Sequence, residues 1–105
     1  MPTLPPNPTI RNLQDYIVDI ELERGFADQS TIQKCLLLGE EVGELFKAVR
    51  GCAGIKVDPA SSVHLVGEEL ADILSFVVAI ANRFEIDLAE AFVEKERKNH
   101  QRTWR

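Results

Sequence analysis

The sequence has few of the residues from which disulfide frameworks, zinc sites and nucleic-acid surfaces are built. Its 105 residues include two cysteines and two histidines. Cys35 and Cys52 do not form a CxxC pair, and no histidine pattern accompanies them. We therefore expect no disulfide, with Cys35 as a small core residue and Cys52 as a loop thiol. The net charge of −5 argues against sequence-independent binding of nucleic acid, which depends on neutralising phosphates with Lys and Arg.

The sequence also lacks an apolar run long enough for a membrane span. The stretch ILSFVVAIA, residues 73–81, is far too short to cross a bilayer, so we expect no membrane partner. Residues 1–8 contain four prolines and have neither the basic start nor the apolar centre of a signal peptide. They predict an extended arm, followed by one domain over residues 9–105. These absences favour a cytoplasmic location.

The clearest feature that is present is helical periodicity. Apolar residues recur at helical spacing in four segments, with no alternating pattern typical of strands. The predicted helices span about 10–24, 30–50, 63–84 and 88–101. Residues suited to N-capping precede each one: Thr9, Asp28 or Ser30, Ser61 or Ser62, and Asp87. Gly25 is expected to end the first helix. The predicted fold class is all-α.

The third predicted helix is apolar around its whole circumference between residues 73 and 81. A helix of this kind is buried on all sides. Three other short helices can hardly cover it, so we expect a second subunit to do so, in a homodimer or a homotetramer.

Two acidic pairs interrupt the apolar stripes of the second and third helices: Glu41 with Glu44, and Glu69 with Asp72. Residues three apart are neighbours on a helix, and like charges at that distance repel, more strongly when they are partly buried. A hard divalent cation that prefers carboxylate oxygens, Mg²⁺ or alternatively Mn²⁺, would compensate them. The two pairs therefore predict a metal site.

The competing interpretation is that each pair lies on an ordinary solvated helix face. Two glycines weigh against it, because Gly43 and Gly67 stand in the middle of helices beside the acidic pairs. Glycine there is about 1 kcal/mol less favourable than alanine. Close approach of another helix or of a ligand would explain both positions.

Three blocks in order, GEEVGEL, EELADILSF and a last helix opening with IDL and continuing as EKERKNHQRTW, resemble the MazG-like family of all-α nucleoside triphosphate pyrophosphohydrolases. The resemblance covers roughly residues 10–104, with 24 residues between Glu44 and Glu69. It implies a four-helix bundle completed by dimerisation or tetramerisation. It also implies that a (deoxy)nucleoside triphosphate is cleaved to monophosphate and pyrophosphate with Mg²⁺, in housecleaning of the nucleotide pool, and that the two acidic pairs are the metal ligands.

The resemblance also assigns contacts to the substrate. Phe76 stands where the family places an aromatic residue that helps to hold the base. The phosphate contacts are matched by Lys95, Asn99 and Arg102, which are spaced as one polar stripe. Without the resemblance, a basic C-terminal turn that complements the helix dipole would be the preferred explanation of that stripe.

The general base and the substrate are left open by the sequence. Glu40 and Glu44 are both candidates to take a proton from the attacking water. Phosphoribosyl-ATP pyrophosphohydrolase, which shares this fold and acidic pattern, is one alternative activity. A dUTP- or dCTP-specific pyrophosphatase is another. A non-catalytic helical oligomerisation or regulatory module is an alternative of another class.

Overall fold

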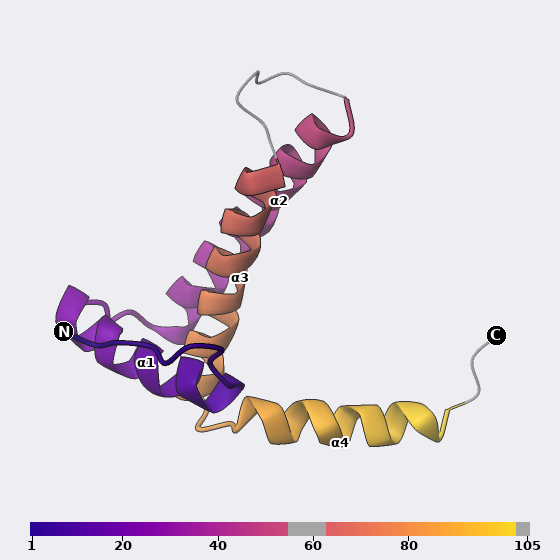
Figure 1. Ribbon diagram of the computed structural model, residues 1–105. Coiled ribbons are helices and arrows are strands. Elements are labelled where there is room, and N and C mark those ends of the chain that lie inside the picture. The colour runs from indigo at the N-terminus through magenta and orange to yellow at the C-terminus, as the bar shows by residue number, and fades with distance from the viewer. Residues whose placement is uncertain (55–62, 103–105) are drawn as a thin grey trace.

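The computed structural model describes residues 1–54 and 63–102, and α-helices are the regular secondary structure of those ranges. The helices are α1 (Ile10–Arg24), α2 (Thr31–Cys52), α3 (Val63–Arg83) and α4 (Leu88–His100). In Figure 1, α2 and α3 run side by side in opposite directions, α1 crosses this pair at the end where α2 begins, and α4 extends away from the other three. The expected all-α fold class is confirmed.

Side-chain caps explain why three of the helices begin where they do. Thr9, Ser30 and Asp87 each accept a hydrogen bond from the backbone N–H three residues later. The side chains of Asn12 and Gln33 accept in return from the backbone N–H groups of Thr9 and Ser30, which completes a capping box at each helix start. Gly25 ends α1 with a φ of 76°, in the left-handed region that favours glycine. The expected cap at Ser61 or Ser62 lies outside the described residues.

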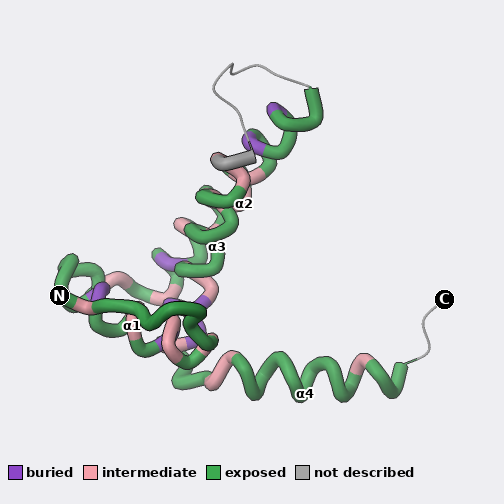
Figure 2. The backbone as a smooth tube through the Cα atoms, viewed as in Figure 1, coloured by how far each residue is buried: buried purple, intermediate pink, exposed green. Residues whose placement is uncertain are grey.

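The buried core of this chain is small. Among the described residues its apolar members are Ile20, Ala48, Val78, Ala79 and Ala81. Figure 2 shows buried positions around the junction of α1 with α2 and α3 and a few more toward the C-terminal end of α2, while α4 is exposed along most of its length. The burial expected around residues 73–81 is therefore only partly supplied by this chain, since Leu74 remains 41% exposed.

The fourth helix gives the chain an open shape. The radius of gyration is 16.3 Å, against about 13 Å for a compact domain of this length. None of the residues of α4 is buried, and Phe92 and Val93 on this helix are 69% and 61% exposed. Large apolar side chains exposed together are typical of surfaces that contact another protein.

Two details differ from the expectations. The second helix runs to Cys52 rather than Arg50. The assignment of Cys35 to the core was wrong, because Cys35 is exposed. Its neighbour Lys34 occupies the inward position instead, where it pairs with Glu21 of α1. In the described ranges, no helix combines the length and apolar character required to cross a membrane.

Candidate functional site

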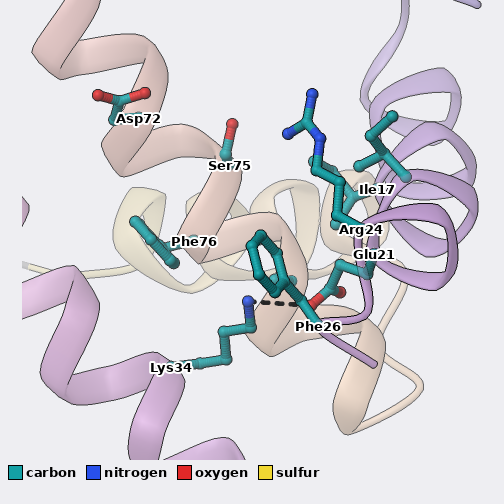
Figure 3. Close-up of a pocket in the computed structure, with 10 residues that line it drawn as sticks. Ile17, Glu21, Arg24, Phe26, Lys34, Asp72, Ser75 and Phe76 are labelled. Atoms are coloured by element: carbon teal, nitrogen blue, oxygen red, sulfur yellow. Dashed lines mark ion pairs between the residues drawn. The ribbon is translucent and has the colours of Figure 1, made fainter. Parts of the chain in front are cut away.

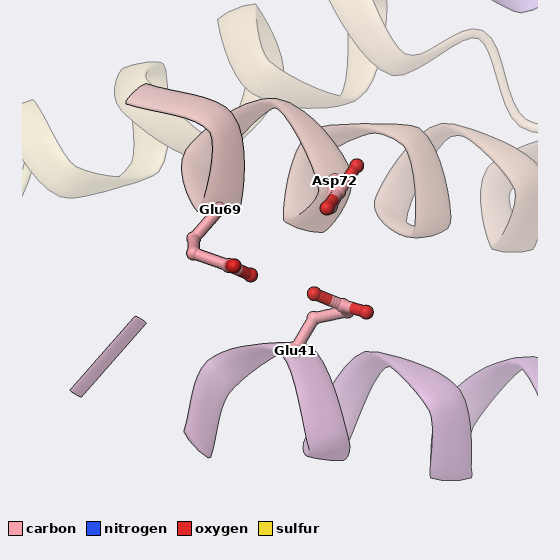
Figure 4. A group of neighbouring side chains, drawn as sticks. All are labelled: Glu41, Glu69 and Asp72. Carbon is pink, nitrogen blue, oxygen red and sulfur yellow. The ribbon is translucent and has the colours of Figure 1, made fainter. Parts of the chain in front are cut away.

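One carboxylate from α2 and two from α3 converge in the space between these helices. Oxygen atoms of Glu41, Glu69 and Asp72 lie within 4.8 Å of one another. Figure 4 shows the two side chains of α3 directed toward Glu41 on α2. The three-residue spacing keeps Glu69 and Asp72 on one face of α3, and the packing of α3 on α2 places Glu41 opposite that face. Three of the four carboxylates expected to bind metal are thus neighbours.

The electrostatics of this group favour a bound cation. A hydrogen bond with Glu69 raises the pKa of Glu41 to about 7, and burial and the charges of Asp72, Glu69 and Glu44 act in the same direction. Glu69 Oε2 is buried and has no hydrogen-bond partner among the described residues, which is unusual for a buried acceptor. A divalent cation would satisfy this oxygen and offset the repulsion. Carboxylate oxygens are also the donors that Mg²⁺ and Mn²⁺ prefer, so these residues fit such an ion.

The remaining acidic candidates lie outside this group. Glu44 adds to the repulsion on Glu41 but is exposed, and Glu40 is exposed as well. Their roles as metal ligand and general base stay predictions. A Cβ atom built at Gly43 or Gly67 would meet no atom within 4 Å. The close approach expected at these glycines is therefore not made by the described part of this chain.

A cavity of about 180 Å³ lies beside the carboxylates, between α1, α2 and α3. Asp72 belongs both to its lining and to the carboxylate group, so the two features are continuous. Phe76, the residue expected to hold a base, lines the cavity from α3, and Phe26 lines it from the loop that follows α1. Figure 3 shows these side chains around the cavity.

Glu21 and Lys34, which line the cavity, form a buried ion cluster with Arg83. Lys34 Nζ lies 3.0 Å and Arg83 Nη2 lies 2.9 Å from Glu21 Oε2, and Arg83 Nη1 donates to Glu21 Oε1 at 3.1 Å. Burial raises the pKa of Glu21, but the hydrogen bonds from Arg83 and Lys34 and their charges outweigh it, so this pKa lies below its ordinary value. Because the three residues belong to α1, α2 and α3, the cluster joins all three helices.

The loop that carries Phe26 is fixed by the same cluster. Arg83 Nε donates to the backbone oxygen of Gln29 at 3.1 Å, and Arg83 Nη2 donates to that of Phe26 at 3.4 Å. These bonds also satisfy guanidinium donors that Glu21 does not accept. The aromatic ring of Phe26 is thereby positioned against the cavity.

Glu21, Lys34 and Phe26 were not identified as site residues from the sequence. A signal for Lys34 was present, because it precedes Glu41 by seven residues, which places both on one face of a helix. Glu21 similarly follows Ile17 by four residues within the apolar stripe of α1. These charges within apolar stripes repeat the pattern that marked the acidic pairs.

The expected phosphate contacts lie apart from the carboxylate group. Lys95, Asn99 and Arg102 belong to α4 and the turn that follows it. That helix runs away from α2 and α3 in Figure 1 and packs mainly on α1. Within one chain, the structure does not bring these three residues to the carboxylates.

The chain is similar in sequence to known proteins. Residues 29–104 match the family model of the MazG nucleotide pyrophosphohydrolase domain. A curated relative, dCTP pyrophosphatase 1 of Mus musculus, is 30% identical over 102 residues, which cover 92% of this chain and 60% of the relative. The chain thus spans less than two thirds of that relative's length. The matched segment contains Glu41, Glu69, Asp72 and Phe76, and we conclude that the chain belongs to the MazG nucleotide pyrophosphohydrolase domain family.

Proposed function

We propose that this chain hydrolyses a (deoxy)nucleoside triphosphate to the nucleoside monophosphate and pyrophosphate, with Mg²⁺ as cofactor and Mn²⁺ as a substitute. The observation that carries the proposal is the convergence of Glu41, Glu69 and Asp72, one of which has a buried oxygen, Glu69 Oε2, that lacks a partner among the described residues. Membership of a pyrophosphohydrolase family supports the same class of reaction.

Different residues of this chain have separate roles in the proposed reaction, in metal binding and in proton transfer. A metal held by the three carboxylates would neutralise charge on the triphosphate and lower the pKa of a bound water. Glu44 or Glu40 accepts the proton from the attacking water. In-line attack on the α-phosphorus then breaks the bond to the bridging oxygen of the β-phosphate, and pyrophosphate leaves.

The phosphate contacts of this proposal come from a second copy of the chain. The α4 helix extends away from its own carboxylate group and exposes Phe92 and Val93, which supports its docking on a partner. Docked there, Lys95 and Arg102 would donate charged hydrogen bonds to the β- and γ-phosphates, with Asn99 beside them. The proposed assembly is a homodimer or a homotetramer.

The first substrate to consider is dCTP, because the mouse relative is named a dCTP pyrophosphatase. The cavity of about 180 Å³ is smaller than the roughly 300–1,000 Å³ of pockets that enclose a whole small ligand. It is suited to one part of a nucleotide, such as the base. Phe26 and Phe76 offer apolar surface for a flat ring.

The test is pyrophosphate release from canonical ribo- and deoxyribonucleoside triphosphates and from phosphoribosyl-ATP, with Mg²⁺ and with EDTA. Chromatography should identify a nucleoside monophosphate and pyrophosphate as the first products, and EDTA should stop their formation. A nucleoside diphosphate accumulating with orthophosphate would contradict the proposal. Stabilisation by Mg²⁺ with no turnover of any nucleotide would favour the non-catalytic module instead.

A further inference from the structure

We propose that Lys34 selects the base of the nucleotide by donating a hydrogen bond to a carbonyl oxygen of that base. The inference rests on the proposed function and concerns the base, the part of the substrate that would bind in the cavity. Cytosine, thymine, uracil and guanine carry a carbonyl oxygen at their edge, and adenine does not. The site therefore favours those four bases over adenine.

Lys34 is placed unusually for a lysine. Its relative exposure is 3%, and lysine is almost never fully buried unless it is paired. An ammonium group has three N–H donors and no acceptor. Among the described residues, Glu21 is the acceptor that pairs with it. The same ammonium lies over the rings of Phe26 and Phe76, in a cavity that Lys34 itself lines.

The aromatic rings place a flat ligand within reach of this ammonium. Lys34 Nζ lies 5.4 Å from the centroid of the Phe26 ring and 5.4 Å from that of the Phe76 ring. Figure 3 shows both rings beside the Lys34–Glu21 pair. Stacking on aromatic side chains holds every base in a similar way, so the two rings alone do not discriminate. The Lys34 ammonium, which lies over both rings, supplies the donor that discriminates between bases.

The neighbours of Lys34 decide which bases it accepts. Glu21 already accepts from both Lys34 and Arg83, so an amino group of the base would have to compete with these two cations for it. The exocyclic amino group of adenine would place its N–H donors against those of the Lys34 ammonium. A carbonyl oxygen would instead accept a hydrogen bond from the ammonium. The cavity reaches Asp72, so a base bound beside Lys34 leaves the phosphates next to the carboxylate group.

The experiment compares kcat/KM for dCTP, dTTP, dGTP and dATP in the wild type, in Lys34→Met and in Lys47→Met, with Mg²⁺. Lys47→Met is the matched control, because Lys47 is an exposed lysine of the same helix. In the wild type and the control, the best carbonyl-bearing substrate should exceed dATP by about tenfold or more. Lys34→Met should bring that ratio close to one. A wild type that turns over dATP as well as the best substrate, or a Lys34→Met variant with an unchanged ratio, overturns the inference.

Two further measurements keep the outcome decisive if Lys34→Met fails to fold or no triphosphate is hydrolysed. In the wild type, replacing the carbonyl oxygen of the preferred base by sulfur, a weaker acceptor, should reduce binding at least several-fold, and equal binding overturns the inference. Calorimetry of the wild type with dCMP, dTMP, dGMP and dAMP, without metal, should rank dAMP last. Absence of pyrophosphate release from every triphosphate refutes the proposed function, and the calorimetric ranking then decides on Lys34 independently.

Discussion

Replacing Glu21 by glutamine should destabilise the fold strongly, because Glu21 is the shared acceptor of two cations. Its relative exposure is 7%, and its carboxylate lies 3.0 Å from Lys34 Nζ and 2.9 Å from Arg83 Nη2. Removing one partner of a buried ion pair typically costs about 3–5 kcal/mol. Arg83 keeps backbone acceptors at Ala79 and Gln29, so we expect a loss of about 3 kcal/mol, at the lower end of that range. Whole domains have unfolding free energies of about 5–15 kcal/mol.

The difference between wild type and Glu21→Gln should depend on pH with a definite sign. Although burial raises the pKa of Glu21, hydrogen bonds from Arg83 and Lys34 bring it below its ordinary value of 4.5. A carboxylate whose pKa is lowered by folding contributes stability above its unfolded-state pKa and loses it as pH falls through the folded-state pKa. The difference should thus be complete near neutral pH and shrink below about pH 4.5.

Urea denaturation followed by circular dichroism at one fixed protein concentration measures both effects. The concentration is fixed because the stability of an oligomer depends on it. Glu23→Gln, which changes an exposed glutamate of the same helix, is the matched control and should unfold like the wild type. If Glu21→Gln unfolds at the same urea concentration as the wild type near neutral pH, or if the difference does not change with pH, the ion cluster does not stabilise the fold as argued.

Three further predictions concern the proposed site and assembly. Mg²⁺ at 100 times its dissociation constant should add about 2.7 kcal/mol to the free energy of unfolding. A Glu41→Gln/Glu69→Gln variant should stay helical but lose this response. If Mg²⁺ stabilises the variant as much as the wild type, the metal assignment is refuted. Light scattering at micromolar concentration should report at least twice the chain mass of 11.8 kDa, because α4 and much of the apolar surface of α2 are exposed, and a clean monomer would contradict the assembly. Lys95→Ala and Arg102→Ala should raise KM and slow turnover while the Mg²⁺-induced rise in melting temperature persists, whereas Asp72→Asn should abolish turnover. Loss of the Mg²⁺ response in Lys95→Ala or Arg102→Ala would show that phosphate binding and metal binding are not separate.

The start of each described helix could be predicted from the sequence where the cap itself is described, because capping is a local interaction. Thr9, Ser30 and Asp87 each bond to a backbone N–H three residues away, so no distant part of the chain is needed. The left-handed turn at Gly25 is local in the same sense. The acidic pairs were recognisable for a related reason, since charges within an apolar stripe are visible in the spacing alone.

The identity of the carboxylates that meet was decided by the packing of α2 on α3. Sequence spacing offered Glu44 as a ligand on equal terms with Glu41. Only the rotation of α2 about its axis brings Glu41 into the group of three and leaves Glu44 exposed. Spacing fixes which residues share a face, but it does not say which part of that face meets the neighbouring helix.

Lys34 and Cys35 show the same division between sequence and tertiary structure. By itself the sequence favoured Cys35 for the interior, because a small apolar side chain is buried at little cost, whereas a charged one requires a partner. The partner of Lys34 is Glu21, thirteen residues earlier on another helix, and Arg83 completes the cluster from a third. The sequence by itself determined the helices and the residue types of the site. Tertiary structure decided which charges compensate one another inside it, because that depends on contacts between helices far apart in the chain.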